Sequence, residues 1–129
     1  TQAFVPGMLQ TAAYARATCR WQHLSESEQE RFVTARLTRG SRLREEGFTL
    51  DTIIEEAVLH RASHMGGVGR EQLAHLREAM TLPSVTVNVL PFTVGIHQSM
   101  SGSFTVLTFP RSILDPIGYQ SFGESIVLV

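Results

Sequence analysis

Two histidines, His60 and His64, stand four residues apart in a segment with helical periodicity. On a helix, side chains at this spacing lie on one face, which is the arrangement of a zinc site. The metalloprotease pattern requires a glutamate after the first histidine, but Arg61 occupies that position and would repel a cation. No cysteine or aspartate lies nearby in the sequence to complete a tetrahedral ligand set. We therefore expect two helix-surface histidines and no metal site.

The glycine-rich segment at 66–69 resembles the start of a dinucleotide-binding loop. Gln72 replaces the third glycine, however, and the segment follows a predicted helix rather than a strand. We expect a glycine turn that breaks the chain between two helices. The alternative is a small-anion site at the helix start beside Arg70.

The remaining nucleophiles and acids lack catalytic partners. The serines around Ser101 do not form the Gly-x-Ser-x-Gly nucleophile elbow. Cys19 stands beside Arg20, but no general base is identifiable, so we expect a small buried thiol. Glu55 and Glu56 are adjacent, and neighbouring residues on a helix do not face each other. The sequence therefore predicts neither an enzyme nor a bound cofactor.

Arginine is concentrated in one part of the chain. Residues 16–44 hold seven arginines and three glutamates, a local net charge of +4, whereas the whole chain has −1. The overall charge argues against direct binding of a nucleic-acid backbone. Arg36, Arg39 and Arg42 recur every three residues, roughly along one helix edge. This edge is either a solvated face paired with glutamates or a surface for an acidic partner or anionic ligand.

The hydrophobic pattern changes along the chain from a period of about 3.6 residues to a period of 2. Ser25 to Glu28 form a capping-box pattern at a helix start. The predicted fold is α+β, with N-terminal helices packed on a mainly antiparallel sheet formed by the C-terminal half. We predict helices over 6–20, from Ser25 to 45–47, over 55–64 and over 70–82, and strands over 48–54, 85–90, 103–109, 117–122 and 125–129.

The 129 residues suit one domain spanning 1–129. No apolar stretch approaches the ~20 residues that span a bilayer, and no export signal is recognisable, so we expect a soluble protein without membrane contact. The lone Cys19 cannot form an internal disulfide, which fits the cytoplasm. Because the sequence stops within an apolar strand, we expect the parent protein to continue beyond Val129.

Several segments, in this order, resemble one protein family. Residues 6–17 (PGMLQTAAYARA) are close to the family's Pro-Gly-Leu-Leu-Gln-Thr-x-x-Tyr-Ala-Arg signature. Gly40 stands where the family usually has glutamine, and Glu55 replaces an aspartate. The other similar segments lie at 35–39, 54–59, 72–76, 87–97 and 102–109.

The chain is thereby similar to the domain that follows an Xre/Cro-type helix-turn-helix in many actinobacterial regulators, including the Scr-type antitoxin-like and WhiJ-type proteins. The resemblance implies a transcriptional regulator whose DNA-binding domain lies upstream of residue 1, so that this chain contacts DNA only through that domain. It also implies a small cognate protein encoded nearby, an unknown small ligand, and no agreed catalytic residues.

We therefore predict a regulatory domain that binds a partner or ligand and forms a homodimer, rather than an enzyme or a direct DNA binder. The alternative is a ligand-free homodimerisation module in which the apolar strand 126–129 pairs between subunits. The predicted partner- or ligand-binding surface combines the N-terminal signature, the arginine edge and the loop after the strand at 85–90. Its residues are Pro6, Gly7, Gln10, Tyr14, Arg36, Arg39, Pro91, Phe92, Gly95 and His97.

Overall fold

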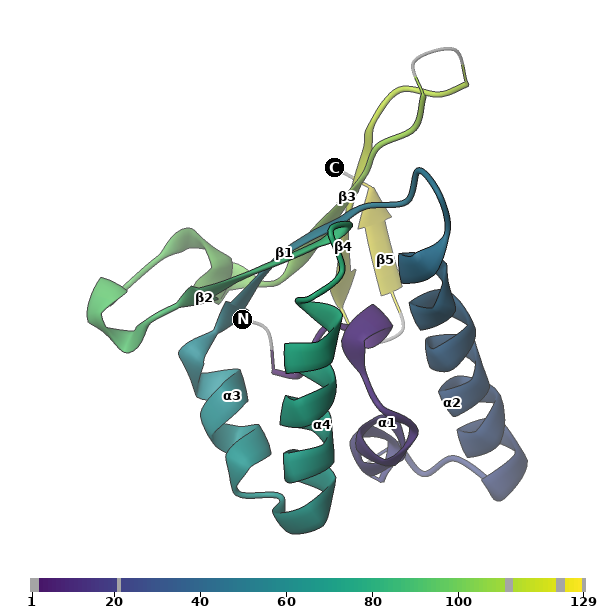
Figure 1. Ribbon diagram of the computed structural model, residues 1–129, viewed down its shortest axis with the longest axis vertical. Coiled ribbons are helices and arrows are strands. Elements are labelled where there is room, and N and C mark those ends of the chain that lie inside the picture. Colours follow the sequence, from purple (N-terminus) through teal and green to yellow (C-terminus); the bar gives the residue numbers. More distant parts are fainter. Residues whose placement is uncertain (1–2, 21, 111–112, 123–124, 129) are drawn as a thin grey trace. The chain divides into compact units, whose positions relative to one another are not determined.

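The structure, a computed structural model, describes residues 3–20, 22–110, 113–122 and 125–128. It divides into two compact units, one of residues 3–93 and one composed mainly of residues 94–129 (Figure 1). Helices precede most of the strands, and the predicted α+β class is confirmed. No helix in these described ranges has the length and apolar character needed to cross a membrane.

The first unit is built around a pair of parallel strands. β1 (Leu50–Glu55) pairs in parallel with β2 (Val85–Leu90), and α3 (Glu56–Ser63) and α4 (Gly66–Ala79) connect them. Two strands joined by helices can run parallel, whereas a tight hairpin requires an antiparallel pair. The described strands form two separate sheets: the one formed by β3, β4 and β5 is antiparallel as predicted, whereas the parallel pairing of β1 with β2 was not predicted.

The predicted N-terminal helix over 6–20 is interrupted. A 3₁₀ turn, η1 (Gly7–Leu9), is followed by Gln10 in an extended conformation and then by α1 (Ala12–Cys19). Thr11 starts α1 as its N-cap, because its side-chain oxygen accepts a hydrogen bond from the amide of Tyr14 at 3.2 Å.

The second helix begins where its capping box predicts. In α2 (Glu26–Ser41), the Ser25 hydroxyl accepts from the Glu28 amide, and the Glu28 carboxylate accepts from the Ser25 amide at 2.8 Å. These two bonds pair amides that have no partner within the helix. Of the residues in α2 only Val33 is buried, and a short 3₁₀ turn, η2 (Arg42–Arg44), follows it.

The predicted break between two helices is present, but it lies at residues 64–65 rather than across 66–69, because α4 already begins at Gly66, which has φ 60°. Gly69 is buried within the first turns of α4, and a Cβ atom there would overlap the carbonyl oxygen of Ala62 on α3. The glycine therefore permits close packing of α3 against α4, a function that the sequence pattern alone does not distinguish from a turn.

The core of the first unit lies between the helices and the parallel pair. Figure 1 shows α3 and α4 side by side on one side of β1 and β2. The buried apolar cluster draws on the N-terminal segment, η2, both strands and α3 and α4. Its members are Val5, Leu9, Tyr14, Leu43, Ile54, Val58, Ala62, Leu76, Ala79 and Val85.

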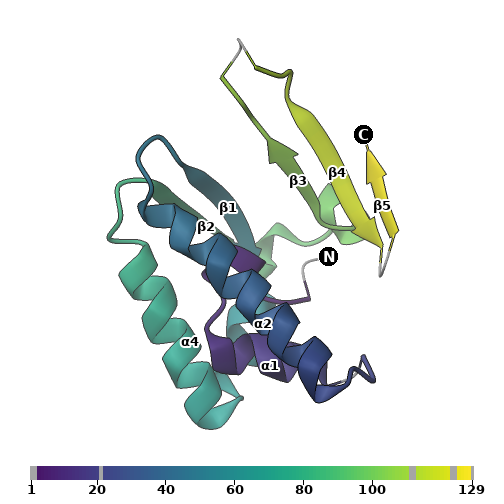
Figure 2. The same ribbon diagram turned by 90° about the vertical axis from the view of Figure 1, so that its right-hand side faces the viewer.

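The second unit contains an antiparallel sheet in the order β3–β4–β5 (Figure 2). Its strands are β3 (Phe104–Leu107), β4 (Ile117–Phe122) and β5 (Ser125–Leu128), each at a predicted position. A 3₁₀ turn, η4 (Gln98–Ser101), precedes the first of these strands. Residue 129, which the predicted strand over 125–129 includes, lies outside the described residues.

Candidate functional site

The signature residues Gln10 and Tyr14 are buried inside the first unit, with 5% and 2% of their surfaces exposed. The Gln10 side-chain amide donates to the carbonyl oxygen of Val5 at 2.8 Å. The Val5 amide in turn donates to the Tyr14 hydroxyl at 3.3 Å. Both side chains therefore fix the N-terminal segment onto the core, and their predicted contact with a partner stays a prediction.

A residue outside the predicted surface completes this N-terminal anchor. Gln72 on α4 is fully buried. Its Oε1 accepts from the Thr11 amide at 2.8 Å, and its Nε2 donates to the Leu9 carbonyl at 2.7 Å. One side-chain amide thus satisfies a donor and an acceptor in the extended link between η1 and α1.

Two other parts of the predicted surface, Gly7 and Arg36, are in contact. A Cβ atom on Gly7 would overlap the guanidinium group of Arg36, so glycine leaves the space that this side chain occupies. Arg36 is half-buried and lies 4.7 Å from the centre of the Phe32 ring, a cation–π geometry. The half-buried Pro6 immediately precedes Gly7.

The arginine edge of α2 does not form one uniform surface. Arg39 is exposed, unlike the half-buried Arg36. Arg42 forms an ion pair with Glu45 at 3.3 Å and lies 5.4 Å from the centre of the Phe48 ring. The neighbouring Gly40, a departure from the family pattern, lies where α2 meets η1, and a Cβ atom there would be 2.8 Å from the Met8 carbonyl oxygen.

A shallow groove of about 600 Å³, wide open to solvent, lies in the first unit, where the chain leaves β2. One stripe of α3 forms one wall, and α4 and the end of β2 contribute the other apolar side chains. Pro91 is the member of the predicted surface that lines it. The lining residues are Glu56, Leu59, His60, Ser63, Leu73, Val89 and Pro91.

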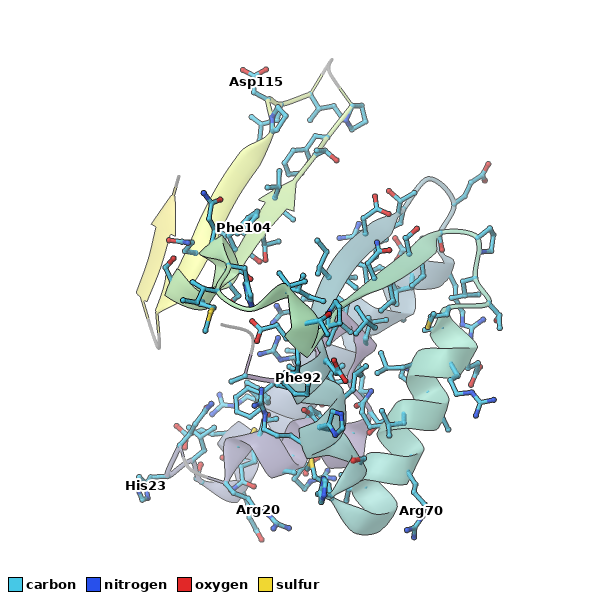
Figure 3. The ribbon with its side chains drawn as sticks, turned by 90° about the vertical axis from the view of Figure 1, so that its left-hand side faces the viewer. Arg20, His23, Arg70, Phe92, Phe104 and Asp115 are labelled. Carbon is cyan, nitrogen blue, oxygen red and sulfur yellow. The ribbon has the colours of Figure 1, made fainter. Side chains whose placement is uncertain are left out.

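Phe92, which also belongs to the predicted surface, lies beside this groove. Its amide donates to Glu56 Oε2 at 2.8 Å, and its ring centre lies 5.5 Å from that of His60, at an interplanar angle of 38°. Figure 3 shows Phe92 beside α3, at the point where the chain leaves β2. The side chain is nevertheless 60% exposed, so an aromatic ring is presented to solvent in a defined position.

Gly95 and His97 belong to the second unit, and their membership of a surface with Pro91 and Phe92 stays a prediction. Gly95 has φ 71°, a left-handed conformation that favours glycine. His97 Nδ1 lies 2.6 Å from the Ser99 hydroxyl oxygen, which orients the imidazole ring.

The histidines considered as metal ligands have local hydrogen-bond partners. His60 Nε2 lies 3.4 Å from Glu56 Oε1, and His64 Nδ1 lies 2.8 Å from the His60 carbonyl oxygen. Within the described residues, no three His, Cys, Asp or Glu side chains are grouped to hold a metal ion. Burial raises the pKa of the Cys19 thiol, which disfavours the reactive thiolate.

The sequence profile of a known domain family matches this chain from residue 1 to residue 129. The chain belongs to the DUF5753 family. The description of DUF5753 is that of a domain of unknown function. No curated protein and no solved structure matches the chain.

In this DUF5753 domain, most residues that line the groove were not predicted from the sequence to form a binding surface. Glu56, His60, Leu59 and Leu73 were assigned to helices, and Val89 to a strand, without being linked to one another. A usable signal was the spacing of Glu56, Leu59, His60 and Ser63, which places all four along one helix face. Their proximity to Pro91 depends on the parallel pairing of β1 with β2, which the sequence did not reveal.

Proposed function

We propose that this chain is a regulatory domain of an Xre/Cro-type helix-turn-helix regulator. It binds a small partner protein and thereby modulates DNA binding by a domain located upstream of residue 1. The resemblance of residues 6–17 and 87–97 to such regulators supports the proposal. The observation that carries it is the apolar groove beside α3, with an exposed but fixed Phe92 at its edge.

The groove has the properties of a binding surface. Leu59, Leu73, Val89 and Pro91 supply apolar surface to it. An aromatic ring such as that of Phe92 contributes a large apolar area to an interface at a low cost in conformational entropy. These features favour recognition of a partner.

The groove also lies close to the N-terminal anchor. Leu73 lines the groove, and Gln72, its neighbour on α4, holds the Leu9 carbonyl and the Thr11 amide. A small shift of α4 on partner binding would therefore act directly on the segment that leads toward the N-terminus. Such a shift is a physical route by which an occupied groove can affect an upstream domain.

The test is size-exclusion chromatography with light scattering, on the chain alone and mixed with the small protein encoded beside its gene. We expect a stable complex, and we expect Phe92→Ala to weaken it. The matched control is Phe4→Ala, because Phe4 is also an exposed phenylalanine of the first unit, at 49%. A complex that persists unchanged in Phe92→Ala would show that the groove is not the binding surface.

The second candidate is the homodimerisation module. It is favoured by β5, which pairs with β4 alone and so lies at an edge of its sheet. A free strand edge can pair with the same strand of a second copy. Light scattering of the chain alone over a wide concentration range decides this candidate, and a monomer at every concentration would reject it.

A further inference from the structure

We infer that the groove beside α3 recognises a polypeptide segment in which an apolar side chain is adjacent to an arginine or lysine. The apolar side chain enters the groove, and the cation pairs with Glu56. This inference rests on the proposed function and specifies the chemistry of the partner.

The apolar part of this inference follows from the groove walls. Leu59, Leu73, Val89 and Pro91 line the groove, and Val89 is 48% exposed although it lies in a strand. Covering such a surface with an apolar side chain removes it from water, at about 25 cal/mol per Å². An aliphatic or aromatic anchor is therefore the favoured occupant.

The open form of the groove favours a polypeptide over a small molecule. Small-molecule sites enclose about 70–90% of their ligand. Here two of the bordering side chains, Val89 and Phe92, are themselves about half exposed. A partner segment that brings its own flanking surface can cover these side chains, whereas a small ligand would leave much of them in water.

The cationic part follows from Glu56. Its side chain is 34% exposed and lines the groove. Oε2 accepts from the Phe92 amide and Oε1 lies 3.4 Å from His60 Nε2, but a carboxylate offers about four acceptor positions. The carboxylate therefore retains acceptor capacity for an arginine or lysine of a partner.

The charge of the groove lining also favours a cation. With histidine counted as neutral, Glu56 is the only charged residue among those that line the groove. Arg70 on α4 projects away from Phe92 (Figure 3). Glu56 therefore favours a cation over an acidic segment or a phosphate at this point of the groove.

The test uses a phage-displayed library of random 12-residue peptides selected against the chain. We expect enrichment of peptides with an aliphatic or aromatic residue next to arginine or lysine. Affinities are then measured for synthetic copies of the enriched peptides and for copies in which citrulline, a neutral analogue, replaces arginine. Loss of the charge should weaken binding on the order of tenfold, the usual scale for a charge-assisted hydrogen bond.

Glu56→Gln is the matching change in the protein. It removes the charge but keeps a carbonyl oxygen that can accept from the Phe92 amide, so the groove retains its shape. We expect the same tenfold loss for arginine peptides and no loss for citrulline peptides. Glu71→Gln on the exposed surface of α4 is the control, and it should leave both affinities unchanged.

Three results would overturn the inference. They are an equal affinity of arginine peptides for the wild type and Glu56→Gln, enrichment of acidic peptides, and the absence of any peptide that depends on the groove. If Phe92→Ala weakens peptide binding but Glu56→Gln does not, the pairing of a cation with Glu56 is refuted, while partner binding at the groove is not. The proposed function fails separately, if the chain forms no complex with the neighbouring small protein.

Discussion

Gln72 gives the sharpest test of how the N-terminal segment is held. We consider Gln72→Leu, which replaces the amide by an apolar group of similar size. Gln72 is fully buried, as is Leu9, and Thr11 is 7% exposed. The substitution therefore leaves the Thr11 amide and the Leu9 carbonyl without their present partner, in a place that water does not reach.

The expected loss follows from these two groups. Leaving one buried polar group without a partner costs about 1–3 kcal/mol. Two groups cost about 2–6 kcal/mol, and the better apolar transfer of leucine offsets part of this. We expect the free energy of unfolding to fall by about 2–4 kcal/mol. With a urea dependence of about 2 kcal/mol/M, in the middle of the usual range for small proteins, the midpoint should fall by about 1–2 M.

Urea denaturation followed by circular dichroism measures this change. The control is Gln22→Leu, because Gln22 is exposed and surface substitutions change stability by about 0.5 kcal/mol or less. Native-state hydrogen exchange adds a local readout, since the Thr11 amide should exchange faster in Gln72→Leu. A loss below about 0.5 kcal/mol together with unchanged exchange at Thr11 would refute the reasoning.

Four further predictions concern helix packing and helix ends. Gly69→Ala should reduce the free energy of unfolding by about 1–3 kcal/mol and so lower the melting temperature, because its Cβ would overlap the Ala62 carbonyl oxygen. A Cβ atom on Gly67 would lie 3.9 Å from its nearest neighbour, so Gly67→Ala should be neutral or stabilising by up to about 1 kcal/mol in the same melting experiment. Ser25→Ala should cost about 1 kcal/mol in urea denaturation, through loss of the N-cap. Hydrogen bonds from Ser25 lower the pKa of Glu28 in the folded state, so its stabilising contribution is complete above the ordinary carboxyl pKa and is lost as the pH falls through the lowered value. Unfolding measured against pH should therefore show a weaker acid dependence in Glu28→Gln, and an unchanged profile would contradict this assignment.

The elements with strong local signals were predictable from the sequence. The capping box at Ser25 predicted the start of α2, and the alternation of valines between Val85 and Val89 predicted β2. These features depend only on residues that are neighbours in the chain, so they can be predicted from a single sequence. The glycine segment misled because a glycine that permits close helix packing and a glycine that ends a helix have the same local pattern, as Gly69 shows.

The candidate site was predictable only in part. Pro91 and Phe92 were named from the sequence, and the structure places them at the groove. Glu56 and Leu73 were not assigned to this surface, because their proximity to it depends on contacts between segments far apart in the chain. Gln72 was noted only as a substitution in a glycine motif. Its hydrogen bonds to Leu9 and Thr11 span more than sixty positions, and no local pattern signals them.

The parallel pairing of β1 with β2 also has a consequence for the order of folding. Leu50 pairs with Val85, so the two strands can meet only after the intervening chain has closed a long loop. Formation of the compact α3–α4 hairpin would shorten the distance that this closure must cover. The β3–β4–β5 pairings, in contrast, join strands that follow one another in the sequence. We therefore expect the slow step in folding of the first unit to be strand pairing after helix formation, because such long-range contacts slow folding.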